Sequence, residues 1–338
     1  MIVAMRQGPR PPLACPSRML GGLDRPVSRI ILGMSAATDD LPRLWDAFVE
    51  LGGNAIDSAH SYPNEVSLGR WLARRPDRDE LIIVGKAGHP HRQGGQPRIR
   101  PSDIEQDLVE SLDRLGRDRI DLFLLHRDDE TIPVGEIMGA LADHRAAGRI
   151  LATGGSNWTT DRLAEADAWT RAHGVPPFDA SSPNLSLAVP MSAPWPGCLT
   201  AGDPASLAWY EREQLPLISW SPLARGFFAD SDDAGDRARP SGPDQELEFQ
   251  AATQAFDTAD NRSRRQRARV LAAELGVSTN EIALAWVMNQ PFPTWATVGA
   301  VSIRQIEQSI AASGLALTAD QVRWLADGGS AAGRTNGR

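Results

Sequence analysis

Residues 54–62 read Asn-Ala-Ile-Asp-Ser-Ala-His-Ser-Tyr, a short apolar run that ends in Asp57 and is followed five residues later by Tyr62. We interpret the run as a short buried strand with a carboxylate at its end. An Asp and a Tyr in this arrangement can handle protons only if other strands bring complementary groups to the same edge of the sheet. The stretch therefore constrains the fold as well as the chemistry.

Two later apolar runs end in an ionisable residue of the kind that this stretch requires. Residues 81–86, Leu-Ile-Ile-Val-Gly-Lys, end in Lys86, and residues 120–126, Ile-Asp-Leu-Phe-Leu-Leu-His, end in His126. The three strand ends meet only if the strands are parallel neighbours. Reactive groups at the ends of adjacent parallel strands are typical of α/β barrels.

Short apolar strands alternate with amphipathic helices along most of the chain, which predicts a parallel sheet. Eight such strands predict a closed, single-domain α/β fold, the (β/α)8 TIM barrel. The predicted strands are residues 30–32, 54–57, 81–85, 120–125, 150–153, 178–181, 215–220 and 294–298. The predicted helices are residues 41–49, 66–73, 102–115, 134–147 and 160–173. A Ser-Asp-Ile-Glu capping box is expected to start the helix at Ser102, and Gly116 to end it.

The barrel is predicted to span residues 18–328, with a short hairpin from Met19 onward. Residues 1–17 are interpreted as a flexible N-terminal extension and residues 329–338 as a flexible C-terminal tail. Long segments follow the third, sixth and seventh predicted strands, where the loops of a barrel line the catalytic face. They predict a substrate pocket with a lid, although surface insertions are the alternative. These segments are residues 88–100, 187–204 and 224–261.

Lys86 is the only lysine among 35 basic residues, so arginine supplies positive charge everywhere else. Lysine differs from arginine because its pKa responds to burial and to neighbouring charges. Tyrosine is almost as scarce, with only Tyr62 and Tyr210. The lone lysine at a strand end therefore favours a functional role over a chance position.

The bulk composition excludes several classes of partner. The net charge is −8 and the arginines are scattered, so neither nucleic acid nor a membrane surface is expected. The two cysteines, Cys15 and Cys198, lack metal-ligand spacing; both are interpreted as inert, no metal site is predicted, and a reducing compartment is expected. No run resembles a signal-peptide core or a membrane span, which favours a cytoplasmic location.

The four residues at the predicted rim permit one kind of chemistry. The ammonium of Lys86, held by Asp57, is expected to lower the pKa of Tyr62 from its usual value of about 10. His126 can donate a hydrogen bond to a carbonyl oxygen and polarise it. The alternative is a buried ion pair beside a core histidine. The other histidines lack such company and are interpreted as surface or loop residues, with His89 and His91 able to touch a substrate: His60, His89, His91, His144 and His173.

Five ordered motifs resemble the successive signatures of the aldo-keto reductase superfamily. The resemblance implies a (β/α)8 barrel that reduces aldehydes or ketones with a nicotinamide dinucleotide, usually NADPH, bound without a Rossmann domain. No G-x-G-x-x-G loop occurs in the chain, as this resemblance predicts. The motifs are residues 57–62 (Asp-Ser-Ala-His-Ser-Tyr), 85–86 (Gly-Lys), 125–128 (Leu-His-Arg-Asp), 155–157 (Gly-Ser-Asn) and 220–226 (Trp-Ser-Pro-Leu-Ala-Arg-Gly).

The resemblance implies roles for individual residues. Tyr62 is expected to be the general acid, with Lys86 and Asp57 as its tuning pair and His126 as the orienting group. The cofactor-binding set begins with Ser156, Asn157 and Ser182 for the nicotinamide carboxamide and Trp220 for stacking on the nicotinamide ring. It continues with Ser221, Pro222, Leu223, Arg225 and Gly226 near the pyrophosphate, and with Gly299, Ser302, Arg304, Gln305, Gln308 and Ser309 near the adenosine end.

Several positions depart from the family pattern. Ser182 stands where many members have Gln, Val301 where Lys or Arg is frequent, Gln305 where Arg is frequent, and Ser309 where Asn is usual. Only Arg304 is left to supply positive charge near a 2′-phosphate. NADPH is the cofactor that the resemblance favours, and NADH is the alternative.

Two other functions fit parts of the sequence. The segment 220–226 also resembles potassium-channel β subunits, which would make the chain a cofactor-binding regulatory subunit with little turnover. A barrel lyase or isomerase could use Lys86 as a Schiff-base amine, but pairing with Asp57 keeps that amine protonated. The expected substrate is a small carbonyl compound, ringed or partly apolar, and the chain is expected to be a monomer or a homo-oligomer.

Overall fold

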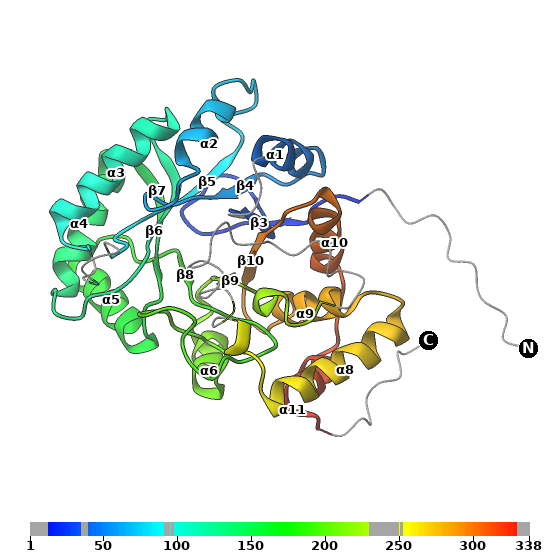
Figure 1. Ribbon diagram of the computed structural model, residues 1–338. Helices are drawn as coiled ribbons and strands as arrows, with labels where there is room; N and C mark the ends of the chain where they lie inside the picture. The colour runs from blue at the N-terminus through cyan, green and yellow to red at the C-terminus, as the bar shows by residue number, and fades with distance from the viewer. Residues whose placement is uncertain are drawn as a thin grey trace, which may run out of the picture.

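The computed structural model describes residues 13–34, 40–90, 95, 98–229, 250 and 253–329. Within this part of the chain, eight parallel strands close into a barrel in which the last strand pairs with the first (Figure 1). The predicted α/β barrel is confirmed. The strands are β3 (Ile30–Gly33), β4 (Ala55–Asp57), β5 (Ile82–Ala87), β6 (Ile120–Leu125), β7 (Ile150–Ser156), β8 (Ala180–Ser182), β9 (Leu217–Trp220) and β10 (Thr294–Gly299).

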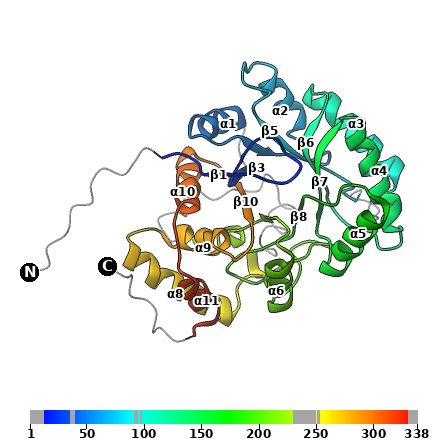
Figure 2. The ribbon, with the colours of Figure 1, turned by 180° about the vertical axis from the view of Figure 1, so that it is seen from behind.

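Helices surround the barrel and cover the outer face of its strands, as Figure 2 shows from behind. The predicted helix ranges did not include α6, α8, α9, α10 or α11. The helices are α1 (Leu41–Glu50), α2 (Glu65–Leu72), α3 (Pro101–Leu115), α4 (Val134–Ala146), α5 (Thr160–His173), α6 (Pro204–Glu213), α8 (Ala259–Leu275), α9 (Thr279–Met288), α10 (Ile303–Ser313) and α11 (Ala319–Asp327), with a short 3₁₀ turn, η1, at Ala224–Gly226.

The N-terminal hairpin lies across one end of the barrel and packs against the inward-facing strand residues there. Its strands are β1 (Ser17–Arg18) and β2 (Val27–Ser28), which pair antiparallel. The buried side chains of Leu20, Leu23 and Val27 join the apolar cluster formed by inward-facing strand residues. The hairpin therefore covers the N-terminal end of the barrel, and the opposite end carries the strand-end residues singled out by the sequence.

The start of α3 differs from the prediction. Arg100 is the N-cap residue, its side chain accepts no capping hydrogen bond, and Pro101 occupies the first turn. The predicted capping box at Ser102 is therefore wrong, because proline with its fixed φ is well suited to the first helical position. Gly116 does end the helix, with φ of 61° in the left-handed region that suits glycine.

The three predicted long segments follow β5, β8 and β9, so their described first residues lie at one rim of the barrel. Most of the proposed lid within 224–261 lies outside the described residues, and α8 begins inside that range. Most of residues 1–17 and 329–338 also lies outside them. Residues 13–17 are described, and the backbone N–H of Cys15 donates to Leu51 O at 2.8 Å.

No single described helix is long and apolar enough to cross a membrane. The pair α8 and α9 satisfies that test only jointly, by length and composition, and it is bent by 101° at the break. Eight of the ten residues of α9 are buried within the fold.

Candidate active site

Asp57, Lys86 and His126 come from three adjacent strands of the barrel. Asp57 is the last residue of β4, Lys86 lies near the end of β5, and His126 directly follows β6. All three side chains are buried, with the whole residues 4%, 7% and 7% exposed. Tyr62 lies in the loop after β4 and is partly exposed. The barrel thus brings together the four residues that the sequence singled out.

Lys86 is the hub of this cluster. Its ammonium donates a hydrogen bond to Asp57 Oδ1 and another to Ser58 O at 3.0 Å. The same nitrogen lies 5.0 Å from the centre of the Tyr62 ring. The Tyr62 ring in turn meets the His126 ring edge-on, with 5.6 Å between their centres. All four side chains therefore share one small volume at the C-terminal rim.

Burial and charge act in opposite directions on these groups. Burial lowers the pKa of Lys86, but the carboxylate of Asp57, together with the nearby Tyr62 oxygen, outweighs it, so the pKa is raised overall and the ammonium stays protonated. Although Tyr62 keeps some exposed surface, the protein atoms packed around its phenol desolvate it and raise its pKa above 10, and Lys86 only partly opposes this effect. Lys86 thus acts in the predicted direction, but desolvation exceeds its effect, so the pKa of Tyr62 is raised overall instead of lowered.

His126 is neutral in this site. Burial, followed by the positive charge of Lys86, holds the pKa of His126 well below its usual 6.5. Its Nδ1 is buried without a hydrogen-bond partner among the described residues. Its backbone N–H donates to Ala87 O at 2.8 Å. A neutral imidazole can donate one hydrogen bond without bringing another full charge beside Lys86.

His89 lies at the site, where its ring meets that of His126 edge-on with 4.7 Å between their centres. This agrees with the interpretation of His89 as a residue able to touch a substrate. Arg127 is a further charged residue that the sequence reasoning missed as a site residue. It is 8% exposed, its Nη1 donates to His126 O at 2.7 Å, and its charge acts to lower the pKa values of Tyr62 and His126. Its place beside His126 in the chain was the available signal.

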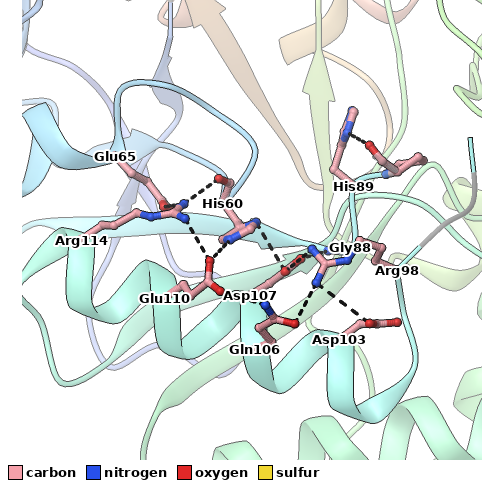
Figure 3. A network of polar contacts seen from close by, with 11 residues as sticks. His60, Glu65, Gly88, His89, Arg98, Asp103, Gln106, Asp107, Glu110 and Arg114 are labelled. Carbon is pink, nitrogen blue, oxygen red and sulfur yellow. Dashed lines mark hydrogen bonds and ion pairs between the residues drawn. The ribbon is translucent and has the colours of Figure 1, made fainter. Parts of the chain in front are cut away.

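Of the histidines interpreted as surface or loop residues, His144 instead lies buried in α4, whereas His60 does lie in a loop. His144 is only 8% exposed. His60 lies between two acidic residues of α3, with Nε2 at 2.7 Å from Glu110 Oε2 and Nδ1 at 3.4 Å from Asp107 Oδ1 (Figure 3). The hydrogen bond from His60 lowers the pKa of Glu110 to about 2. The loop position of His60 agrees with the prediction, but its acidic partners could not be predicted because they come from a distant helix.

His91 lies outside the described residues. His173 is exposed, as predicted, and stacks on Trp169 with ring centres 4.0 Å apart. Both cysteines are buried, and burial raises the pKa values of the thiols of Cys15 and Cys198. Raised thiol pKa values agree with the interpretation that both are inert.

The residues predicted to hold the carboxamide lie together at the ends of β7, β8 and β9. Ser156 Oγ donates to Ser182 O at 2.8 Å, and Asn157 Nδ2 donates to His126 O at 3.2 Å. Asn157 Oδ1 accepts from Trp220 Nε1 at 3.2 Å. Ser182 Oγ donates to Ile218 O at 2.8 Å. Each hydroxyl keeps lone pairs that can accept from an amide N–H, so these residues fit a carboxamide beside His126.

The segment after β9 has an unusual backbone. Ser221, Ala224 and Arg225 have φ values of 48°, 48° and 54°, which non-glycine residues rarely adopt. Such strain is found mostly at functional sites, and left-handed residues in succession can aim backbone N–H groups at an anion. The guanidinium of Arg225 stacks over Trp195 at 4.7 Å from the ring centre, and Trp195 lies 5.9 Å from Trp220. The backbone N–H groups of Ala224, Gly226 and Phe227 donate to carbonyls within the segment, so its strained backbone and the Arg225 side chain are what mark it as a candidate pyrophosphate segment.

The residues predicted near the adenosine end lie at the start of α10. Ser302 caps this helix by accepting from Gln305 N at 3.4 Å. Ser309 Oγ donates to Gln305 O at 2.7 Å, so it is engaged by its own helix. Gly299 ends β10, and Arg304 and Gln308 follow on α10. A cavity of about 180 Å³ separates α1 from this segment, and it is lined by Asp40, Arg43, Leu44, Val301, Ser302 and Ile303.

A closed parallel barrel with a buried Asp–Lys pair, a tyrosine and a neutral histidine at its C-terminal rim is the arrangement of an α/β-barrel enzyme with a candidate acid–base site. The sequence profile of the Aldo/keto reductase family matches residues 29–327. The chain belongs to that family and is an oxidoreductase.

Three relatives illustrate the similarity. Norsolorinic acid reductase A of Aspergillus parasiticus is 26% identical over 292 residues, which cover 83% of this chain and 69% of the relative. Aldo-keto reductase str7 of Strobilurus tenacellus is 27% identical over 317 residues, 90% of this chain and 87% of the relative. Aryl-alcohol dehydrogenase [NADP(+)] of Phanerodontia chrysosporium is 25% identical over 304 residues, 84% of this chain and 74% of the relative.

Proposed function

We propose that this chain reduces an aldehyde or ketone to the alcohol with NADPH, and that Tyr62 is the general acid. Family membership supports NADPH-dependent carbonyl reduction in general. The observation that carries the finer assignment is the convergence of Tyr62, Lys86, Asp57 and His126 at one end of the barrel. The alternative roles, a regulatory subunit and a Schiff-base enzyme, gain no support from this geometry.

A bound dihydronicotinamide supplies the hydride. The neutral ring of His126 donates a hydrogen bond to the carbonyl oxygen, which orients the substrate and withdraws electron density from its carbon. Tyr62 then transfers its phenolic proton to the same oxygen. The raised pKa of Tyr62 keeps this proton in place at neutral pH.

Lys86 acts after the proton has left. Its ammonium faces the phenolate that remains on Tyr62 and stabilises that charge, since an opposite charge at short range favours the ionised form. Asp57 holds the ammonium in place and keeps it protonated. This protonation argues against a Schiff-base role, which needs a neutral amine.

The residues at the ends of β7 to β10 would hold the cofactor. Ser156, Asn157 and Ser182 would bind the carboxamide, and Trp220 would stack on the nicotinamide ring. Ser221 to Gly226 would line the pyrophosphate, and the start of α10 the adenosine. Arg43 lines the cavity beside Ser302 and would add a second arginine to Arg304 near a 2′-phosphate once its ion pair with Asp40, which lines the same cavity, has opened. This pair favours NADPH over NADH.

We propose that the substrate is an aromatic carbonyl compound. The rings of Tyr62, His89 and His126 meet edge-on at the site, and Trp195 with Trp220 adds an aromatic wall. Aromatic side chains favour planar aromatic ligands through offset-stacked and edge-to-face contacts. The relatives named for aryl alcohols agree with this choice.

The test is a cofactor-oxidation assay with the purified chain. NADPH and NADH are each offered with benzaldehydes, acetophenones and matched straight-chain aldehydes, and absorbance loss of the reduced cofactor is followed. The proposal expects turnover with NADPH and higher kcat/KM for the aromatic compounds. Cofactor binding without oxidation by any carbonyl would overturn the enzymatic assignment in favour of the regulatory one.

A further inference from the structure

A network of buried and half-buried polar groups lies beside the proposed site and has no part in the chemistry described above (Figure 3). It connects the loop after β4, the loop after β5 and helix α3. Its central members are His60, Asp107 and Glu110, with Arg98 and Arg114 at its edges. Ionic groups are costly to bury, so their position beside the two reactive loops calls for an explanation.

Asp107 is the buried centre of the network, with only 1% of the residue exposed. Its Oδ2 accepts from Gly88 N at 3.0 Å, and its Oδ1 accepts from Arg98 Nη1 at 2.5 Å. The same Oδ1 lies 3.4 Å from His60 Nδ1. One carboxylate on α3 therefore contacts both the loop after β4 and the loop after β5.

The backbone at Gly88 depends on this contact. Gly88 has a φ of 79°, and a Cβ built there would lie 2.6 Å from Ile99 Cγ2, so the turn has no room for a side chain. Lys86 precedes Gly88 by two residues and His89 follows it. The hydrogen bond from Gly88 N to Asp107 thus fixes the turn that separates Lys86 from His89, whose ring packs on His126.

His60 makes polar contacts through its backbone N–H, its carbonyl and its ring. Its backbone N–H donates to Lys86 O at 2.9 Å, and its carbonyl accepts from Arg114 Nη1 at 2.9 Å. Its ring lies between Asp107 and Glu110. The residue stands midway along the five-residue path from Asp57 to Tyr62. Because this path is short, a shift of His60 displaces the phenol of Tyr62.

We propose that Asp107 and His60 are positioning residues that hold the two reactive loops in register, so that the Tyr62 hydroxyl faces Lys86 and the carbonyl oxygen. The proposal rests on the proposed function of Tyr62. A reacting group that is misplaced by about 1 Å can lose about 100-fold in rate. The pair therefore acts on the chemical step through the placement of Tyr62, and it leaves the cofactor segment after β9 untouched.

Three variants and one matched control test the pair. Asp107→Asn keeps the size of the side chain but removes its charge. His60→Ala removes the ring, and His60→Gln restores an amide N–H that can reach Glu110. Glu105→Gln is the control, because Glu105 lies on the same helix and pairs with Arg149, away from both loops.

The proposal expects Asp107→Asn and His60→Ala to lower kcat about 10- to 100-fold, with NADPH affinity within twofold of wild type by fluorescence titration. His60→Gln is expected to recover at least threefold of the loss, and Glu105→Gln to change nothing. A merely structural role would lower thermal stability and leave kcat of the folded enzyme intact. Unchanged kcat in both variants, or equal losses of kcat and of NADPH affinity, would overturn the proposal.

Amide hydrogen exchange separates this inference from the proposed function. In Asp107→Asn, the amides of residues 58–62 and of Gly88 are expected to exchange faster than in Glu105→Gln, whether or not the wild type reduces a carbonyl. Wild type without turnover would defeat the proposed function alone. Equal exchange in the two variants would defeat the positioning role even in an active enzyme.

Discussion

Lys86 donates one hydrogen bond to Asp57 Oδ1 and another to the backbone carbonyl of Ser58, and both acceptors lie on the neighbouring strand β4 or directly after it. The ammonium and the carboxylate are both buried. The parallel pairing of β4 with β5 creates this contact between residues 29 positions apart. Each charge is tolerated inside the barrel because the other is present.

Removing only one member of this pair should be far more damaging than removing both. Lys86→Met leaves a buried carboxylate without its cation, and such a loss costs about 3–5 kcal/mol. The double variant Asp57→Asn with Lys86→Met is expected to be more stable than Lys86→Met alone. Urea denaturation of the two single variants and the double variant measures the coupling. Additive losses would show that the two charges do not depend on each other.

Tyr62→Phe should abolish turnover and spare cofactor binding. The change removes the phenolic proton, and general acid catalysis contributes about 10²–10⁴-fold. The chain supplies its own control, because Tyr210 is the only other tyrosine. Tyr210 is buried and hydrogen-bonded to Ser181 at 2.7 Å, so Tyr210→Phe is expected to cost about 1 kcal/mol of stability and no activity. Steady-state kinetics that survive in Tyr62→Phe would remove Tyr62 from the acid role.

Carbonyl reduction should be independent of pH between about 6 and 8. The pKa of His126 is held well below 6.5, so this ring stays neutral and does not titrate over that range. The pKa of Tyr62 is raised above 10, so its proton is also retained. A pH profile of kcat checks both the lowered pKa of His126 and the raised pKa of Tyr62. An acid limb near pH 6.5 that disappears in His126→Gln would contradict the assignment of a neutral histidine.

Asp128 should make the folded state less stable as pH rises from about 4 to 6. Burial raises the pKa of Asp128 to about 6, although Arg162 lies 3.2 Å away and opposes the shift. The folded state therefore holds a proton that the unfolded state has lost, and this stabilisation is complete below about pH 4 and lost above about 6. A shift of this size corresponds to at most about 3 kcal/mol. Chemical denaturation of wild type and Asp128→Asn at several pH values gives the difference, and a constant difference would refute the prediction.

Arg43 and Arg304 should select NADPH over NADH. Each alanine variant is expected to raise KM for NADPH about three- to tenfold, because an exposed charge contact contributes about 1 kcal/mol. KM for NADH is expected to stay the same, since NADH lacks the 2′-phosphate. Parallel kinetics with the two cofactors check this. Equal losses with both cofactors would place the arginines in general binding of the adenosine instead.

Much of the fold was predictable from local patterns. The strand at Ile120–Leu125 and the helix at Thr160–His173 match the prediction residue for residue. Both have strong patterns, an apolar run in one and clear end signals in the other. Helices α8 and α9 were not predicted for opposite reasons: α8 is crowded with arginines, and α9 is buried almost all round, so neither shows a clear apolar stripe.

The candidate site was predictable where a residue is rare in the sequence or stands at the end of a predicted strand. The lone lysine, the two tyrosines and the strand-end histidine stand out without any structure. His60 and Arg127 did not stand out, because a loop histidine and one arginine among many look ordinary. Their partners, Asp107 for His60 and the carbonyl of His126 for Arg127, became visible only in the folded chain.

The sequence by itself determined the order of the barrel strands, and with it the meeting of Asp57, Tyr62, Lys86 and His126 at one rim. Patterns of apolar residues decide this, because burial drives each strand into the same sheet. Only the tertiary structure decided the balance between burial and charge, which raises rather than lowers the pKa of Tyr62. That balance depends on everything packed around the phenol, and residues distant in sequence supply it.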